Sequence, residues 1–95
     1  MTTYHYNIEL RDKDGKFYLD SKGNKLTLNT FRFVDHTNNE NLIELICRDT
    51  FDNYKAICKE GTDINIEIRV FNKISNSFML LYSFYGAENK FIKHF

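Results

Sequence analysis

The sequence predicts an α+β fold in which an antiparallel sheet of five or six strands packs on one long amphipathic helix. Two observations lead to this fold class. Apolar residues recur with the period of a helix over residues 37–61, and every other apolar run alternates with the period of a strand. The expected order is three strands, the helix, and two or three further strands, in a single domain over residues 1–95. Short turns favour antiparallel pairing, in either a two-layer stack or a strongly curved sheet.

The expected helix has a start signal, an apolar face and a stop signal. Thr37 is followed three residues later by Glu40, which is the capping-box pattern, and Gly61 is the residue type that commonly follows a helix end. The apolar face comprises Ile43, Ile46, Cys47, Thr50, Phe51, Tyr54, Ile57 and Cys58. The weak helix former Asp49 leaves one alternative open, in which residues 42–48 form a short strand and a second helix follows.

Alternating apolar residues predict the strands before the helix. Residues 4–11 form the first, a turn with the hairpin signal Asp-Gly follows, and residues 17–20 form the second. The third strand covers residues 26–33, where the alternation slips by one position near Asn29. A β-bulge at this point would keep both phenylalanines of the strand on the core face, whereas without a bulge they face the other side.

The strands after the helix are the most regular. Residues 63–71 alternate strictly, residues 72–77 are polar enough for a hairpin loop, and residues 78–85 are apolar on both faces. A polar break precedes residues 90–95, which are expected to form a short edge strand.

Composition limits the classes of function. The chain has 95 residues, 13 basic and 13 acidic side chains and a formal net charge of zero. This balance argues against proteins that bind mainly by neutralising phosphates and against acidic mimics of DNA. No signal peptide or membrane-length apolar run is visible. Cys47 and Cys58 lie about three turns apart on the expected helix, too far for a disulfide, and two free thiols indicate a reducing, cytoplasmic location.

Signals of enzymatic activity are weak. The sequence has no glycine-rich phosphate loop, no nucleophile elbow and no His-Glu pair at helical spacing, so we expect no catalytic residue, no metal and no other cofactor. One alternative is a small ribonuclease. In that hypothesis His5, Glu9, Arg11 and Arg69 share one sheet face as an acid–base pair with a phosphate clamp.

Another alternative is a module that binds single-stranded RNA or DNA. Phe31, Arg32 and Phe33 place a cation between two aromatic rings on one strand, and Tyr18 lies on a neighbouring strand. Bases stack on sheet aromatics of this kind. The competing interpretation is that these aromatics belong to the core, because so short a chain needs most of its apolar residues there. The zero net charge also disfavours nucleic acid as a partner.

The hypothesis favoured by the sequence is a small non-enzymatic protein–protein interaction domain. Phe71, Met79, Leu81 and Tyr85 are expected on the sheet face away from the helix, where an exposed apolar patch would bind a protein partner. The partner is either a second copy, in a homodimer, or a host macromolecule. A smaller apolar stripe is expected on the helix, formed by Leu42, Leu45 and Ala56. The competing interpretation is that residues 90–95 cover one of these patches.

One specific form of this hypothesis rests on composition alone. The chain is rich in Asn, Ile, Lys and Phe and has neither Pro nor Trp, a usage typical of phages and AT-rich bacteria. Small domains of such origin include inhibitors, so the hypothesis extends to a phage or mobile-element inhibitor of a host defence or host enzyme.

Overall fold

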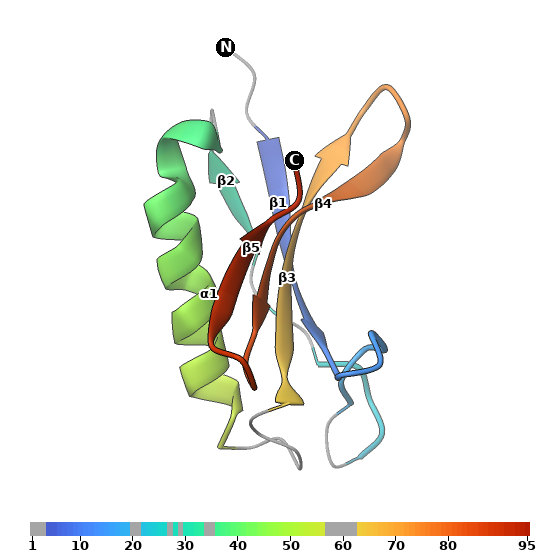
Figure 1. Cartoon of the computed structure of the whole chain (residues 1–95). Coiled ribbons are helices and arrows are strands. Elements are labelled where there is room, and N and C mark those ends of the chain that lie inside the picture. Colours follow the sequence, from blue (N-terminus) through green and yellow to red (C-terminus); the bar gives the residue numbers. More distant parts are fainter. Residues whose placement is uncertain (1–3, 20–21, 27, 29, 34–35, 57–62) are drawn as a thin grey trace.

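The computed structural model describes residues 4–19, 22–26, 28, 30–33, 36–56 and 63–95, which form a five-stranded antiparallel sheet with one helix packed against it (Figure 1). In chain order the elements are β1 (Tyr4–Arg11), β2 (Phe31–Phe33), the 3₁₀ turn η1 (Thr37–Asn39), α1 (Glu40–Tyr54), β3 (Asn65–Asn72), β4 (Ser77–Tyr85) and β5 (Lys90–Lys93). The strand order across the sheet is β2-β1-β3-β4-β5. The predicted α+β fold, an antiparallel sheet on one amphipathic helix, is therefore confirmed.

The helical segment is continuous from Thr37 to Tyr54, which excludes a strand over residues 42–48. Ile43 and Cys47 are fully buried on its inner face, as the periodicity predicts. The Glu40 carboxylate contacts the sheet, which the capping pattern does not predict. Its Oε1 accepts a hydrogen bond of 3.1 Å from the Tyr82 hydroxyl and lies 3.0 Å from the Lys93 ammonium, so this carboxylate joins the helix to the sheet. The expected stop at residue 61 and the rest of 57–62 lie outside the described residues.

The core lies between α1 and one face of the sheet. Cross-strand pairs such as Ile68 with Tyr82 and Ile66 with Phe84 place buried side chains side by side. The Phe84 ring meets the Phe51 ring of α1 edge to face at 5.5 Å. The buried apolar residues are Tyr6, Leu10, Ile43, Cys47, Ile64, Ile66, Ile68, Val70, Leu81, Tyr82 and Phe84. Each full burial of such a side chain contributes about 1.5–3 kcal/mol of stability, so this cluster is the main source of folding free energy.

Between β1 and β2 the described residues form two isolated bridges instead of the expected middle strand. Arg11 pairs with Phe17, and Leu19 pairs with Lys25. The Arg11 guanidinium and the Lys25 ammonium lie 3.6 and 3.4 Å from the centre of the Phe17 ring, so cation–π contacts hold this segment against β1. The bulge expected near Asn29 falls on a residue outside the described part of the chain.

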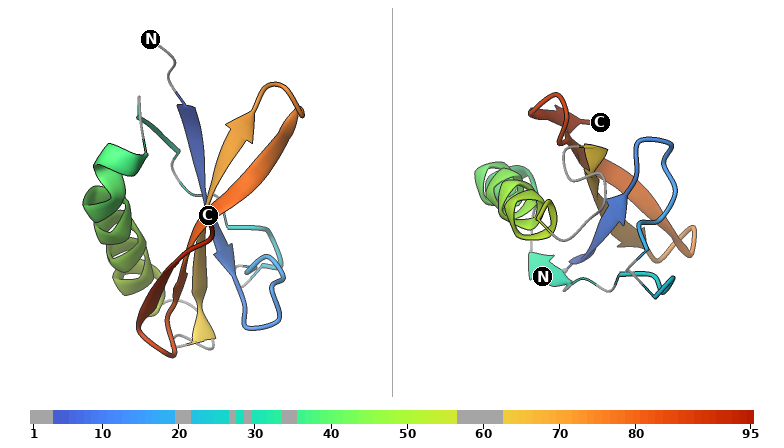
Figure 2. Two further views of the ribbon diagram at one scale, coloured as in Figure 1. Left: turned by 45° about the horizontal axis from the view of Figure 1, so that its top comes forward. Right: turned by 90° about the horizontal axis from the view of Figure 1, so that it is seen from below.

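A bulge is found elsewhere, in the pairing of β3 with β4. Ile68 pairs with Tyr82 and Arg69 pairs with Leu80, so Leu81 is an extra residue on β4. The bulge reverses the alternation of β4. Even-numbered residues face the core after the bulge, and odd-numbered residues face the core side before it. It also divides β4 into a half that β5 covers and a half that projects (Figures 1 and 2).

The helix covers one face of the sheet, while the β3–β4 hairpin and residues 12–19 project on the far side (Figure 2). The strands fan out, and the free end of the hairpin leans away from α1 (Figure 1). In the described part of the chain no helix combines the length and the apolar character needed to cross a membrane.

Candidate functional site

The four residues predicted to form one exposed partner-binding patch do not share a face. Leu81 is only 1% exposed, which contradicts the expectation that it lies on the surface. Met79 is 50% exposed and pairs with Val70, so it lies on the same face as the helix. Phe71 and Tyr85 are both partly exposed and lie near the C-terminal ends of β3 and β4, which are at opposite ends of the sheet because the two strands are antiparallel. The bulge at Leu81 is the physical reason, since strict alternation was assumed through it.

The aromatic residues predicted to bind nucleic acid are also separated. The Phe31 ring stacks on the buried Tyr6 ring, with 5.0 Å between the ring centres and 4° between the ring planes. Phe31 therefore packs against the core, as the competing interpretation expects. Arg32 is exposed and pairs with His5, which places it on the face opposite Phe31. Tyr18 is partly buried against the core. The Phe33 side chain lies outside the described part, so its role stays a prediction.

The charged residues of the ribonuclease hypothesis meet on the sheet face away from α1, joined by a second carboxylate. Glu9 accepts from Arg11 at 2.6 Å and from Arg69 at 3.0 Å. Glu67 lies 2.9 Å from Arg69 and 3.6 Å from Arg11. Each guanidinium is thus neutralised by two carboxylates, and neither is free to clamp a phosphate. His5 stands four residues before Glu9 on β1, roughly 13 Å along the strand, so the expected acid–base pair is not assembled.

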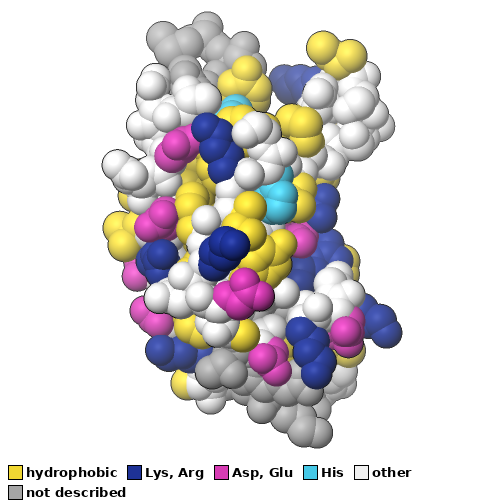
Figure 3. Space-filling model, in the orientation of Figure 1, with side chains coloured by type: hydrophobic (Ala, Val, Ile, Leu, Met, Phe, Trp, Pro, Cys, Tyr) yellow, Lys and Arg dark blue, Asp and Glu magenta, His cyan; other side chains and the backbone are white. Residues whose placement is uncertain are grey.

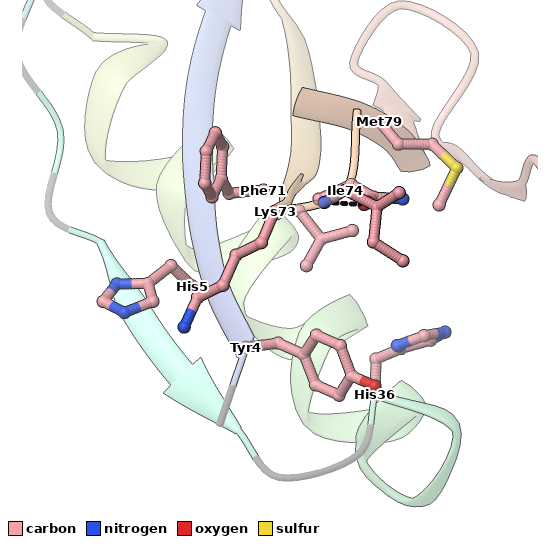
Figure 4. Close-up of a pocket in the computed structure, with 9 residues that line it drawn as sticks. Tyr4, His5, His36, Phe71, Lys73, Ile74 and Met79 are labelled. Carbon is pink, nitrogen blue, oxygen red and sulfur yellow. Dashed lines mark hydrogen bonds between the residues drawn. The ribbon is translucent and has the colours of Figure 1, made fainter. Parts of the chain in front are cut away.

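A groove opens where β1 and β3 separate (Figure 4). β1 pairs with β3 only as far as Val70, because beyond that point β1 turns toward β2 and the β3–β4 hairpin leans away. The groove has a volume of about 430 Å³. Tyr4, His5 and His36 line one side, and the hairpin supplies Phe71, Ile74 and Met79 on the other. Its size is within the range of small-molecule or side-chain pockets, and its lining is mainly apolar.

The groove wall near β1 is an aromatic cluster around His36. The centre of the His36 ring lies 6.3 Å from the centre of the Tyr4 ring and 5.1 Å from that of Phe95, and both pairs are edge to face. It also meets the buried Tyr82 ring at 6.5 Å. The wall is therefore continuous with the core through these ring contacts.

The other wall is the free end of the hairpin, residues 71–80, which we call the hairpin tip. Ile74 is 98% exposed at its apex. Two hydrogen bonds close the turn that presents it, because the Asn72 side-chain oxygen accepts from the Ile74 and Ser75 N–H groups at 2.9 and 3.3 Å. Asn76 adopts a left-handed conformation with φ of 53°, which asparagine tolerates better than most residues. Figure 3 shows hydrophobic side chains at this tip, whereas charges of both signs are mixed along the rest of that face.

Sequence reasoning missed Tyr4, His36 and Ile74 as site residues. One signal was available: Ile74 is an isolated apolar residue in a polar hairpin loop whose turn chemistry needs only its asparagines. The groove lies where β1 and β3 stop pairing, and the alternation of apolar residues does not show where two strands separate. The predicted helix stripe is present, since Leu42 and Leu45 are 44% and 53% exposed.

Two further groups bear on chemistry. Burial raises the pKa of the Cys47 thiol to about 12, so it stays protonated and unreactive in the folded protein. Cys58, which was expected to be a second free thiol on the helix, lies outside the described residues. Among the residues that are described, no three His, Cys, Asp or Glu side chains are grouped closely enough to hold a metal ion.

Comparison with protein-family models, with curated proteins and with solved structures found no match.

Proposed function

We propose that this protein is a protein-binding module whose groove, between β1 and the hairpin tip, receives apolar side chains of a partner protein. The observation that carries the proposal is Ile74, an apolar side chain almost fully in water on a hydrogen-bonded turn. Leaving such a side chain exposed forgoes the free energy of burying it, about 1.5–3 kcal/mol, which binding would recover. The apolar groove beside it offers the partner a matching recess.

Two features favour a protein over other ligands. The described charges around the groove are few, with Lys73 the charged side chain that lines it, so binding there depends mainly on apolar contact. Aromatic residues and Met, which are enriched at protein interfaces, line both walls. A narrower form of the proposal, based on composition alone, is that the protein inhibits a host defence or a host enzyme.

The test is affinity capture from a lysate of the organism that encodes the protein, treated with nuclease, using matched variants as bait. Ile74→Ser and Met79→Ser alter the groove, and Leu45→Ser alters an apolar residue on α1 whose exposure matches that of Met79. We expect one protein to be captured in stoichiometric amount by wild type and Leu45→Ser, and lost from both groove variants. Equal capture by all four baits would contradict the proposal, and so would capture that depends on nucleic acid.

A further inference from the structure

The outer edge of β4 is paired over only part of its length. β5 pairs with Tyr82–Tyr85, and the His94 N–H adds one bond of 2.8 Å to the Leu81 carbonyl. Within the described part of the chain, no strand pairs with the outer edge of Ser77, Phe78, Met79 and Leu80. In a strand, alternate N–H and C=O groups point to each side, so this stretch presents unpaired backbone donors and acceptors to water.

We propose that this open edge of β4 pairs with the same edge of a second copy, forming a symmetric dimer in which the two sheets join through their β4 strands. The inference does not rest on the proposed function, because it concerns the outer backbone edge of β4, whereas the groove lies between the hairpin and β1; Met79 lines the groove and also lies on this stretch of β4. An isologous contact of this kind needs a self-complementary surface, and an antiparallel strand pair across a twofold axis supplies one.

Charge selects this edge over the others. The edge strand β5 begins and ends with Lys90 and Lys93, and the middle residue of β2 is Arg32. Cations on edge strands oppose edge-to-edge pairing, and two copies joined through either strand would bring like charges together. The stretch 77–80 has no charged residue and no proline, and the formal net charge of the chain is zero. Two copies therefore meet here without repulsion.

The faces of the side chains fix the register. Facing residues in an antiparallel pair point to the same side of the sheet, so a twofold axis must relate residues of equal parity. Placing the axis at Phe78 pairs it with its own copy and sets Ser77 opposite Met79. This register uses only the open stretch and leaves the bond between His94 and Leu81 intact.

The Phe78 axis also buries the apolar groups that the monomer exposes. Phe78 is 43% exposed and Met79 is 50% exposed. The Phe78 ring lies 5.2 Å from the Phe71 ring on β3, so the dimer brings two such pairs together as a row of four rings across the axis. The contact is short, which places it among the smaller and weaker interfaces and predicts dissociation at low concentration.

Sedimentation velocity over a series of protein concentrations tests the dimer. We expect wild type to shift from monomer to dimer as concentration rises, Phe78→Lys to remain monomeric, and Ile74→Lys, whose change lies at the apex and not on the edge, to dimerise like wild type. Far-UV circular dichroism and the urea midpoint show whether each variant is folded. A wild type that stays monomeric, or a Phe78→Lys variant that still dimerises, would overturn the inference.

Disulfide trapping tests the register without placing a charge on the edge. Directly opposed residues of an antiparallel pair have Cα atoms about 4.5–5.5 Å apart, within the range of a disulfide. With Cys58 replaced by Ser, Phe78→Cys should form a covalent dimer on mild oxidation, and Ile74→Cys should not. Equal trapping at both positions would refute the Phe78 axis. Loss of a captured heterologous protein on Phe78→Lys, with a monomeric wild type, would assign the edge to that protein's strand and refute the second copy.

Discussion

Leu81 and Met79 lie two residues apart on β4, where regular alternation would make their environments equivalent. The bulge makes them different: Leu81 is 1% exposed and Met79 is 50% exposed. We therefore predict that alanine at position 81 destabilises the fold far more than alanine at position 79. The comparison tests the bulge directly, because a regular strand would give similar costs.

The magnitudes follow from burial. Leu81→Ala removes three buried carbon atoms, a transfer cost of about 2.4 kcal/mol at 0.8 kcal/mol per methylene, and the cavity raises the total to about 3–4 kcal/mol. Met79→Ala removes atoms that are half in water already and leaves no enclosed cavity, so its cost is about 1 kcal/mol or less. In a domain of this size 1 kcal/mol lowers the melting temperature by roughly 4–8 °C, so the two variants should differ by about 10 °C or more.

Urea unfolding at low protein concentration, followed by circular dichroism and tyrosine fluorescence, measures both free energies. The chain has six Tyr and no Trp, so tyrosine is the intrinsic probe. Unchanged m-values would show that the variants differ in stability and not in compactness. Equal destabilisation by the two substitutions would refute the bulge. The same reasoning predicts that Leu81→Asp unfolds the protein, so Met79 is the residue at which to test binding.

Three further predictions concern single residues. Gly86→Ala should destabilise the fold by roughly 1–3 kcal/mol in the same urea assay, since a Cβ there would lie 2.6 Å from the Ile64 carbonyl oxygen; wild-type stability would contradict that close approach. The hydrogen bond to Lys93 lowers the pKa of Glu40, so its contribution is present above the ordinary pKa of 4.5 and is lost as pH falls through the lower folded value. Glu40→Gln should thus be less stable than wild type at neutral pH, and the gap in urea midpoints should close in acid; a gap independent of pH would contradict this. Cys47, with its pKa raised to about 12, should resist alkylation until the protein unfolds, as peptide mass spectrometry would show, and rapid labelling in native buffer would contradict its burial.

The helix and the long strands were predictable because each buries one continuous face. Ile43 and Cys47 fall on the inner face of α1, and β3 alternates between buried and partly exposed positions as its sequence does. Local periodicity reports burial directly in such elements. The predicted fold class needed nothing more than these patterns and the order in which they occur.

Residues 17–19 and the bulge show where pattern fails. Phe17 and Leu19 alternate with polar residues like a strand, yet they form single bridges, because contact with cations and with β1 replaces a full ladder. The residues on both sides of Leu81 are apolar, so the sequence does not show which of them face the core. A bulge at this position therefore cannot be recognised from the alternation. Half of the predicted partner patch was misplaced for that one reason.

The four charges at the centre of the sheet explain why the candidate surfaces lie at its end. Glu9, Arg11, Glu67 and Arg69 cover the middle of the face away from α1 in mutually neutralising pairs, so this face needs no second apolar layer and offers none to a partner. Three of the large apolar side chains that are exposed among the described residues, Ile74, Phe78 and Met79, lie at the hairpin tip, which extends beyond the strands on both of its sides. A hairpin that leaves the sheet creates two surface features at once, a groove where it separates from β1 and an open edge where β5 no longer covers it. Under the two proposals, a partner protein contacts the hairpin from the β1 side and a second copy contacts its outer edge, and single substitutions at Ile74 and Phe78 test the two separately.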